Sequence, residues 1–402
     1  MSNDYIDYFK DKNGIKIEDK IRDDNKWIMF ACLDEYMPTL GASLDCIYKD
    51  FVTNILENKN FIDILNKFFE MKNDGESFMQ NIKSIYNSPR YDKITKKKSS
   101  AIYLSGFTGH VISLLCLIDD TNKKFKIVVI NSGLGVGYHG VFDHEYAKKG
   151  NVAVAIEFTD DKYDTVMSII TDYNESYSSD KQGKNKEHTF YNIFIKDLLD
   201  HSINNGTENK WNNIVINQNN VMEYYLQMSG TCAYFSCLYP LLYLMHEYSK
   251  IKPIRNLHTK FKLFEYMLCV SLLNKIITTN EYIIGMIKNK SILINNYLNN
   301  ISVNNDSKLV DESFSNVSAW LKDQMKILHE KYKKTDIQIQ DFNFSGTTNK
   351  YTDEKKMVNT NIIDNDYKNI DYNGGGGLIA PTRVLLFFLL NQILLNTSIC
   401  II

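Results

Sequence analysis

The segment Ser105–Gly140, which reads SGFTGHVISLLCLIDDTNKKFKIVVINSGLGVGYHG, decides the fold of this protein. Two apolar runs rich in β-branched residues flank the polar sequence DDTN at Asp119–Asn122. Short β-branched runs separated by turn residues are typical of β-strands joined in a hairpin. The segment therefore predicts an antiparallel hairpin, and its register decides which side chains meet at the open end.

A turn centred between Asp120 and Thr121 would place His110 opposite Asn131. Side chains directly opposite each other have Cβ atoms about 4.5–5.5 Å apart, so the amide would reach the imidazole and fix its tautomer. The other pairs on this face are apolar, as a core-facing side requires: Ile112–Val129, Leu114–Ile127 and Cys116–Phe125. The opposite face, with Val111–Ile130 and Leu115–Lys126, is predicted to be a mixed surface.

Strands are also predicted on both sides of the hairpin, from AIYLSGF at residues 101–107 and NVAVAIEF at residues 151–158. Polar spacers follow at residues 174–188 and 204–213. Residues 221–300 are strongly apolar and predict mostly helix, and residues 310–334 predict an amphipathic helix that begins near Asp311 or Ser313. The sequence thus predicts an α+β fold.

Composition divides the chain into five regions. Residues 1–98 are predicted to be a helical N-terminal region, and residues 99–300 the core domain. An amphipathic helical extension at 301–335 is followed by a flexible linker at 336–377, which ends in four glycines. The last region, 378–402, contains 19 uncharged residues from Val384 to Ile402, close to the ~20 that span a bilayer. It is either a membrane anchor, a helix docked on the domain, or a poorly soluble tail.

Charge and cysteine usage exclude several classes of protein. The 46 basic and 48 acidic residues nearly cancel, which argues against a nucleic-acid binder. The seven cysteines include no CxxC pair, so a zinc ribbon or a thioredoxin motif is not indicated. The polar N-terminus lacks the features of a signal peptide. We therefore expect a reducing, intracellular (cytoplasmic) location, with membrane attachment if the tail is an anchor.

The sequence QMSGTC at Gln227–Cys232 precedes a long apolar run. Thr231 is a suitable N-cap, which would place Cys232 in the first turn of a helix. The helix dipole and a nearby imidazole would lower the pKa of the thiol, and the thiolate would act as a nucleophile. Gln227 and the backbone N–H of Cys232 would stabilise an oxyanion, and Gly230 would leave room for substrate.

Each of these residues also has a simpler interpretation. Cys232 is a small buried hydrophobe, His110 a strand-end residue and Asn131 a turn residue. Cys237 lies inside the apolar run, with no polar residues like those that precede Cys232, and we predict that it belongs to the core. Pro240 either bends the helix or begins a second one.

The order His110, Asn131, Gln227, Cys232 resembles the papain-like cysteine peptidases in their permuted form, the clan of ubiquitin-like-protein proteases, adenoviral proteases and bacterial effector deubiquitinases and acetyltransferases. The resemblance covers roughly residues 99–250. It implies a papain-like core, in which an antiparallel sheet packs on a nucleophile-bearing helix. It also implies that Cys232 is the nucleophile, His110 the general base and acid, Asn131 the orienting residue and Gln227 the oxyanion donor. Thr231 stands where the clan has Asp.

The resemblance extends to the residues around the site. Gly109 and Gly230 match the clan's glycines beside its histidine and cysteine. NSGLGVGYH is similar to a run in effector-like members, which implies that Tyr138 and His139 line the substrate cleft; the alternative is that they belong to a surface loop.

No metal or cofactor is predicted. His139, Asp143 and His144 have no standard ligand spacing. NSGLGVG lacks the GK[ST] ending of a phosphate-binding loop.

The predicted function is that of an intracellular cysteine peptidase or isopeptidase. Its substrate would be a protein or peptide, and the resemblance points to ubiquitin or a ubiquitin-like protein. Two alternatives remain open: an acyltransferase that uses the same cysteine, and a non-catalytic papain-like interaction module tethered to a membrane.

Overall fold

The computed structural model describes residues 15–17, 68–70, 75–87, 98–140, 149–179, 186–203, 211, 214–215, 221–227, 232–252, 254–278, 281–303 and 312–332. Within them the protein has an α+β fold built on a five-stranded antiparallel sheet. Its strands follow one another in space as they do along the chain: β2 (Ala101–Phe107), β3 (His110–Asp119), β4 (Lys124–Ile130), β5 (Lys149–Thr159) and β6 (Val221–Tyr225). The four strands predicted between residues 101 and 158 are confirmed.

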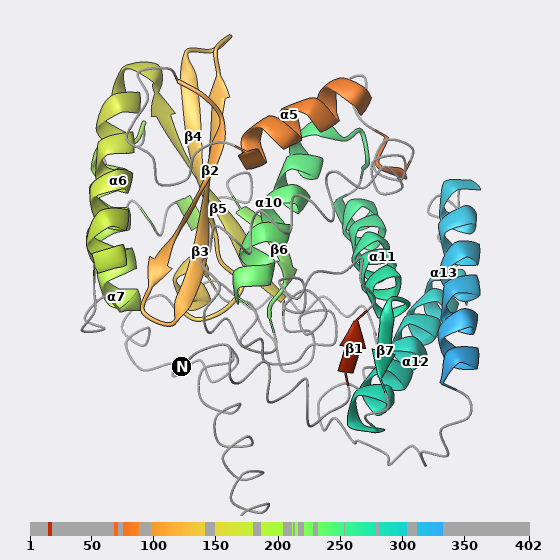
Figure 1. Ribbon diagram of the computed structural model, residues 1–402. Coiled ribbons are helices and arrows are strands. Elements are labelled where there is room, and N and C mark those ends of the chain that lie inside the picture. Colours follow the sequence, from red (N-terminus) through yellow and green to blue (C-terminus); the bar gives the residue numbers. More distant parts are fainter. Residues whose placement is uncertain are drawn as a thin grey trace, which may run out of the picture.

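Helices cover both faces of this sheet (Figure 1). On one face lies α6 (Tyr163–Ser179), followed by a second helical stretch made of α7 (Glu187–Thr189), the π-helix η5 (Phe190–Phe194) and α8 (Ile195–Asp200). On the other face lie α5 (Gly75–Asn87) and α10 (Cys232–Tyr248). Two short 3₁₀ helices, η3 (Val136–His139) and η4 (Asp160–Lys162), complete this part of the chain.

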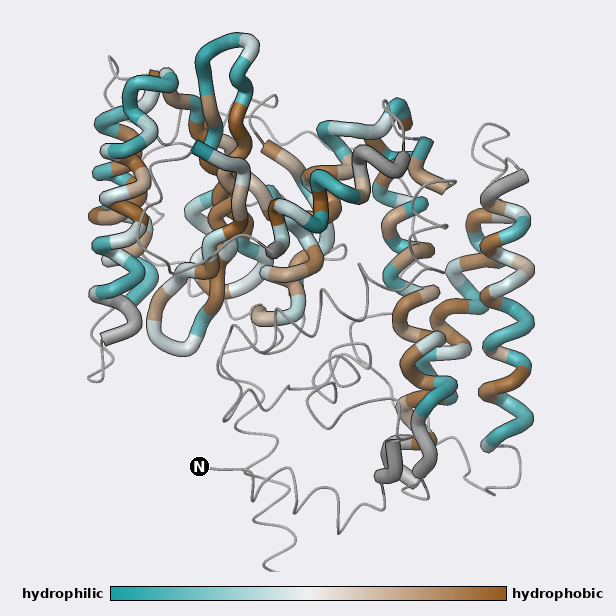
Figure 2. Tube along the Cα trace, turned by 45° about the horizontal axis from the view of Figure 1, so that its top comes forward, coloured by the Kyte–Doolittle hydropathy of each residue, from teal (hydrophilic) through white to brown (hydrophobic). Residues whose placement is uncertain are grey.

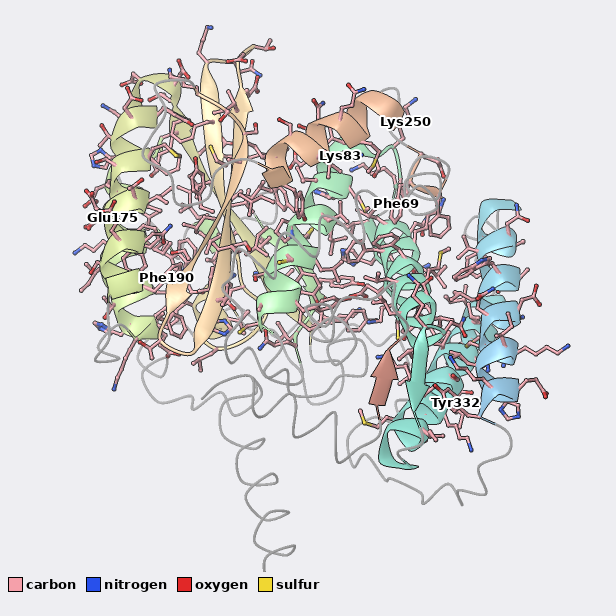
Figure 3. All side chains as sticks on the ribbon, in the orientation of Figure 1. Phe69, Lys83, Glu175, Phe190, Lys250 and Tyr332 are labelled. Carbon is pink, nitrogen blue, oxygen red and sulfur yellow. The ribbon has the colours of Figure 1, made fainter. Side chains whose placement is uncertain are left out.

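Both faces of the sheet are therefore buried, and the prediction of a mixed surface on the second face is wrong. Ile112 and Leu114 point to the α6 side, whereas Leu115 and Val128 point to the α10 side. In Figure 2 the strands are mainly hydrophobic between helices with hydrophilic outer sides, and Figure 3 shows Phe190 between α6 and the sheet. The alternation of strand residues divides the core into two layers, one on each side of the sheet.

Three longer helices extend the core on the α10 side of the sheet: α11 (Ile254–Leu273), α12 (Glu281–Val303) and α13 (Glu312–Lys331). The helix predicted near residue 311 is confirmed by α13. Next to them β1 (Ile15–Ile17) pairs antiparallel with β7 (Ile276–Thr278). Strands β1, β6 and β7 all lie in regions predicted to be mainly helical. With three residues each, β1 and β7 are too short to show the alternation that identifies a strand.

The hairpin of β3 and β4 forms with a register two residues away from the predicted one. Ser113 lies opposite Ile130, and Asp119 opposite Lys124, so the turn contains four residues and not two. Asp119 accepts hydrogen bonds from the backbone and side-chain nitrogens of Asn122, and Lys123 adopts a positive φ of 53°. Because the side-chain period of a strand is two, a shift of two leaves every residue on its predicted face.

Helix α10 is continuous through Pro240. A proline cannot donate to the carbonyl four residues earlier, here that of Ser236. The hydroxyl of Ser113, from β3, donates to that carbonyl, and the hydroxyl of Tyr86 donates to the next one, Cys237 O, at 2.7 Å. A side chain from the sheet thus replaces the backbone bond that the proline removes, and one from α5 donates to the neighbouring carbonyl. Cys237 itself is buried in the core, as predicted.

The linker at 336–377 and the apolar segment at 384–402 lie outside the described residues. Among the helices that the structure does describe, none is long and apolar enough to span a bilayer.

Candidate functional site

His110 is the first residue of β3 and follows a two-residue turn, Thr108–Gly109. Gly109 has a φ of +80° at the second central position of this turn, where a glycine is favoured. Gly106 has a φ of +138°, and a Cβ on it would lie 2.3 Å from the carbonyl oxygen of His110. The two glycines therefore allow β2 to turn tightly and approach β3 closely beneath the imidazole. The Phe107 ring lies beside the imidazole of His110, with ring centroids 5.2 Å apart.

Asn131 directly follows β4, and its Oδ1 lies 2.8 Å from Nε2 of His110, so the predicted hydrogen bond is present. The amide of Asn131 is fully bonded. Oδ1 also accepts from the backbone N–H of Gly133 at 2.9 Å. Nδ2 donates to Leu134 O at 2.8 Å and to the Tyr191 hydroxyl at 2.9 Å. Both side chains are buried, His110 at 4% exposure and Asn131 at 2%.

These bonds determine the tautomer of His110. Exchanging the oxygen and nitrogen of Asn131 would set its NH₂ against the Gly133 N–H and its oxygen against the Leu134 carbonyl, two repulsive contacts. Oδ1 must therefore face His110, and because an amide oxygen only accepts, Nε2 must carry the proton. The neutral imidazole then has its lone pair on Nδ1, which leaves that nitrogen able to take a proton from another group.

Cys232 is the first residue of α10, as predicted. Its sulfur is close enough to the backbone N–H groups of Val111, Cys232 and Ala233 for each of them to lower the pKa of the thiol. Along an antiparallel strand, successive backbone N–H groups point alternately toward the two neighbouring strands. In β3 the N–H of Val111 points toward β4 and not toward β2. Strand β4 has ended at Ile130, level with Ser113. The thiol is therefore beside the end of β3, one residue from His110.

The prediction of a lowered Cys232 pKa is wrong. Burial raises the pKa of this thiol above its usual value, and the three backbone N–H groups offset only part of that effect. Burial likewise lowers the pKa of His110 to about 4, against a smaller opposite effect of its bond to Asn131. His110 is buried and Cys232 is half-buried, and this loss of solvent disfavours their charged forms. At neutral pH the thiol and the imidazole are both uncharged, and they form no ion pair beforehand.

Gln227 lies two residues after β6, and its side chain is 3% exposed. Its backbone N–H donates to Ser132 O at 2.9 Å, and its Oε1 accepts from the Ser132 hydroxyl at 3.1 Å. A Cβ on Gly133 would lie 2.6 Å from Nε2 of Gln227. The structure thus packs the amide of Gln227 against the loop that begins with Asn131. Gly230 and Thr231 lie outside the described residues.

Tyr138 and His139 occupy the 3₁₀ helix η3 behind Asn131. The ring of Tyr138 is half-buried and stacks on Tyr191 with centroids 4.4 Å apart. His139 is fully buried, so it belongs to no surface loop and has no exposed surface for substrate. Burial lowers its pKa to about 4.

Tyr191 is a residue of the site that sequence reasoning did not identify. It lies in the π-helix and is 5% exposed. Its hydroxyl lies 3.0 Å from Nε2 of His139 and accepts the bond from Asn131 already described. The sequence FYNIF contains no local motif that would single it out. A π-helical turn in a longer helix is the structural signal, since such turns often accompany functional sites.

No cluster of three or more metal-binding side chains is present among the described residues. Asp143 and His144 lie outside them. Comparison with protein-family models, with curated proteins and with solved structures finds no match to this chain.

Proposed function

We propose that this protein is a thiol hydrolase that cleaves a peptide or isopeptide bond through Cys232, His110 and Asn131. The observation that carries the proposal is the bond from His110 Nε2 to Asn131 Oδ1, 2.8 Å long, next along the chain to Val111, whose backbone N–H interacts with the thiol of Cys232 at the first position of a helix. The bond leaves Nδ1 of His110 as the acceptor for the thiol proton. The backbone N–H groups around the sulfur would stabilise the thiolate once it forms.

The reaction would begin with transfer of the Cys232 proton to Nδ1 of His110 as the sulfur attacks the substrate carbonyl carbon. The carbonyl oxygen becomes an oxyanion, to which the backbone N–H of Cys232 and the side-chain NH₂ of Gln227 would donate. The imidazolium then protonates the leaving nitrogen, and the C–N bond breaks to leave an acyl-cysteine. Water, deprotonated by the same imidazole, releases the acid and restores the thiol.

The proposal is supported by how little freedom the His110–Asn131 pair has. Two backbone groups and one hydroxyl hold the amide, and the amide holds the ring. The papain-like resemblance and the choice of ubiquitin-like substrates belong to the same proposal and rest on the order of the four residues.

The test is labelling of the full chain with an electrophilic ubiquitin or peptide probe, read by peptide mass mapping. We expect adduct at Cys232 and none in Cys232→Ala or His110→Ala. Cys237 provides an internal control, because it lies five residues later in the same helix and is 1% exposed. Adduct at Cys237 or Cys116 with none at Cys232 would remove the assignment.

A second measurement separates hydrolysis from transfer. Release of a fluorogenic amine from a peptide substrate is expected to follow labelling across the same variants. Labelling of Cys232 without release, together with transfer of the acyl group to an added amine, would instead favour an acyltransferase.

A further inference from the structure

A second buried imidazole, that of His139, lies behind Asn131. Its Nδ1 is 2.9 Å from Asn151 O, and since a carbonyl only accepts, Nδ1 carries the proton. Asn151 in turn donates from Nδ2 to the His139 carbonyl at 2.9 Å. This reciprocal pair fixes the ring, which also packs against Trp211 in a T-shaped arrangement with centroids 5.7 Å apart. The neutral imidazole of His139 therefore offers the lone pair of Nε2 to its other neighbour.

That neighbour is Tyr191. Its hydroxyl hydrogen can point only to His139 Nε2, because Asn131 Nδ2 is itself a donor. The bonds consequently run in one direction, from His110 to Asn131, then from Asn131 to Tyr191, from Tyr191 to His139 and from His139 to the Asn151 carbonyl. A chain of hydrogen bonds aligned in this way strengthens each member.

We infer that Tyr191 and His139 are positioning residues, which act on His110 through the amide of Asn131. The inference rests on the proposed function. Without the Tyr191 hydroxyl, one N–H of Asn131 and Nε2 of His139 would be left buried without partners. Buried polar groups find partners, so the amide would rotate toward another acceptor and carry Oδ1 away from His110 Nε2. The packing favours this role, because Tyr191 is clamped between the stacked ring of Tyr138 and the edge of Phe190.

The first test reads the two rings directly, by imidazole ¹⁵N NMR of the full chain labelled at histidine, with signals assigned from His110→Asn and His139→Gln. At pH 7 we expect two neutral rings in opposite tautomers, His110 protonated at Nε2 and His139 at Nδ1. In Tyr191→Phe the His139 Nε2 signal should shift as it loses its donor, and the His110 signal should change toward a mixture of tautomers.

The matched control is Tyr224→Phe. Tyr224 is also a buried tyrosine, 1% exposed, whose hydroxyl donates to Glu265 at 3.1 Å, away from His110. This variant loses one buried hydroxyl at similar cost, and both imidazole signals should stay as in the wild type. If Tyr191→Phe moves the His139 signal but leaves His110 unchanged, Tyr191 has no positioning role and the inference is overturned.

The second test reads turnover. In Tyr191→Phe we expect kcat to fall about tenfold, with KM unchanged, because one hydrogen bond that orients the base is lost. His139→Gln, whose side-chain oxygen can accept the Tyr191 hydroxyl, should lose less activity than His139→Met. Equal losses in these two variants would contradict a role for the acceptor. The NMR result does not depend on turnover, so a chain without hydrolase activity would disprove the proposed function and still leave the coupling of the rings measurable.

Discussion

At the scale of single residues, the site combines a well-ordered acceptor with an uncharged thiol. Asn131 leaves His110 one tautomer, with the lone pair on Nδ1. The same burial that orders these side chains disfavours the charges that a thiolate–imidazolium pair would need. The expected chemistry is therefore proton transfer during attack, and not attack by a thiolate that exists beforehand.

This ionisation state predicts how Cys232 reacts with iodoacetamide as pH changes. Because the pKa of the thiol is raised, thiolate forms only in the alkaline range. The alkylation rate at Cys232, followed by mass spectrometry, should rise continuously to above pH 9. A rate that levels off below pH 7 would show a preformed ion pair and contradict the prediction.

Gly133 predicts a variant that displaces Gln227 without altering it. In Gly133→Ala the new methyl group would lie 2.5 Å from Cδ of Gln227, so the amide must move. If that amide stabilises the oxyanion, kcat for peptide hydrolysis should fall by up to about 10²–10³-fold. Labelling of Cys232 by a small alkylating reagent should persist.

The control for this variant is Gly285→Ala in α12. A Cβ there meets nothing within 4 Å, and alanine favours a helix, so activity should stay unchanged. Full turnover in Gly133→Ala would exclude Gln227 as the oxyanion donor.

At the scale of elements, a hydrogen bond between a side chain of strand β3 and a carbonyl of helix α10 holds the two elements together. Pro240 deprives the Ser236 carbonyl of its helical donor, and Ser113 in the middle of β3 supplies a hydroxyl in its place. The resulting contact fixes α10 against the strand whose first residue is His110. A proline that would weaken an isolated helix thus marks the point where helix and sheet are attached.

The exchange of partners at this point predicts a coupling between Ser113 and Pro240. Ser113→Ala leaves a buried carbonyl without a donor and should lower the free energy of unfolding by about 1–3 kcal/mol. In Pro240→Ala the restored N–H can serve that carbonyl, so adding Ser113→Ala there should cost clearly less. Urea unfolding of the four proteins measures the difference, and additive effects would rule out the exchange.

At the scale of the whole molecule, two helical layers enclose the sheet, and the His110–Asn131 pair is buried, whereas Cys232 is half-buried. His110 and His139 are both held neutral by burial, with pKa values lowered to about 4. Tyr191 in their network keeps its proton at neutral pH, because burial raises the pKa of its phenol and Glu187 of α7 acts in the same direction.

This burial predicts that acid destabilises the fold. Between pH 6.5 and 4 the unfolded chain binds protons at these two histidines and the native protein does not, so stability falls as pH falls. Each histidine should contribute about 1.4 kcal/mol per pH unit in that window. The free energy of unfolding, measured with urea at several pH values from 6.5 to 5, should depend less steeply on pH in His139→Gln than in the wild type.

The exposed His188 provides the control, as His188→Gln removes an imidazole from the surface. If the free energy of unfolding of His139→Gln depended on pH as steeply as that of the wild type, His139 would not be held neutral in the native state.

The sequence by itself determined the elements whose pattern is local: four strands, the helix that begins at Cys232, and the burial of Cys237. It also placed His110 and Asn131 on one face at the open end of a hairpin, although its register was displaced by two residues. The displacement left the predicted faces correct, because side chains on the same face of a strand recur every two residues.

Only the tertiary structure decided what depends on distant parts of the chain. The second buried face of the sheet requires α10, which lies more than 100 residues after β3. The raised pKa of Cys232 follows from packing, which no spacing reveals. Tyr191 joins Asn131 to His139 from a helix that carries no motif. Periodicity reports which face of an element is buried, whereas desolvation and hydrogen-bond networks arise only when separate elements meet.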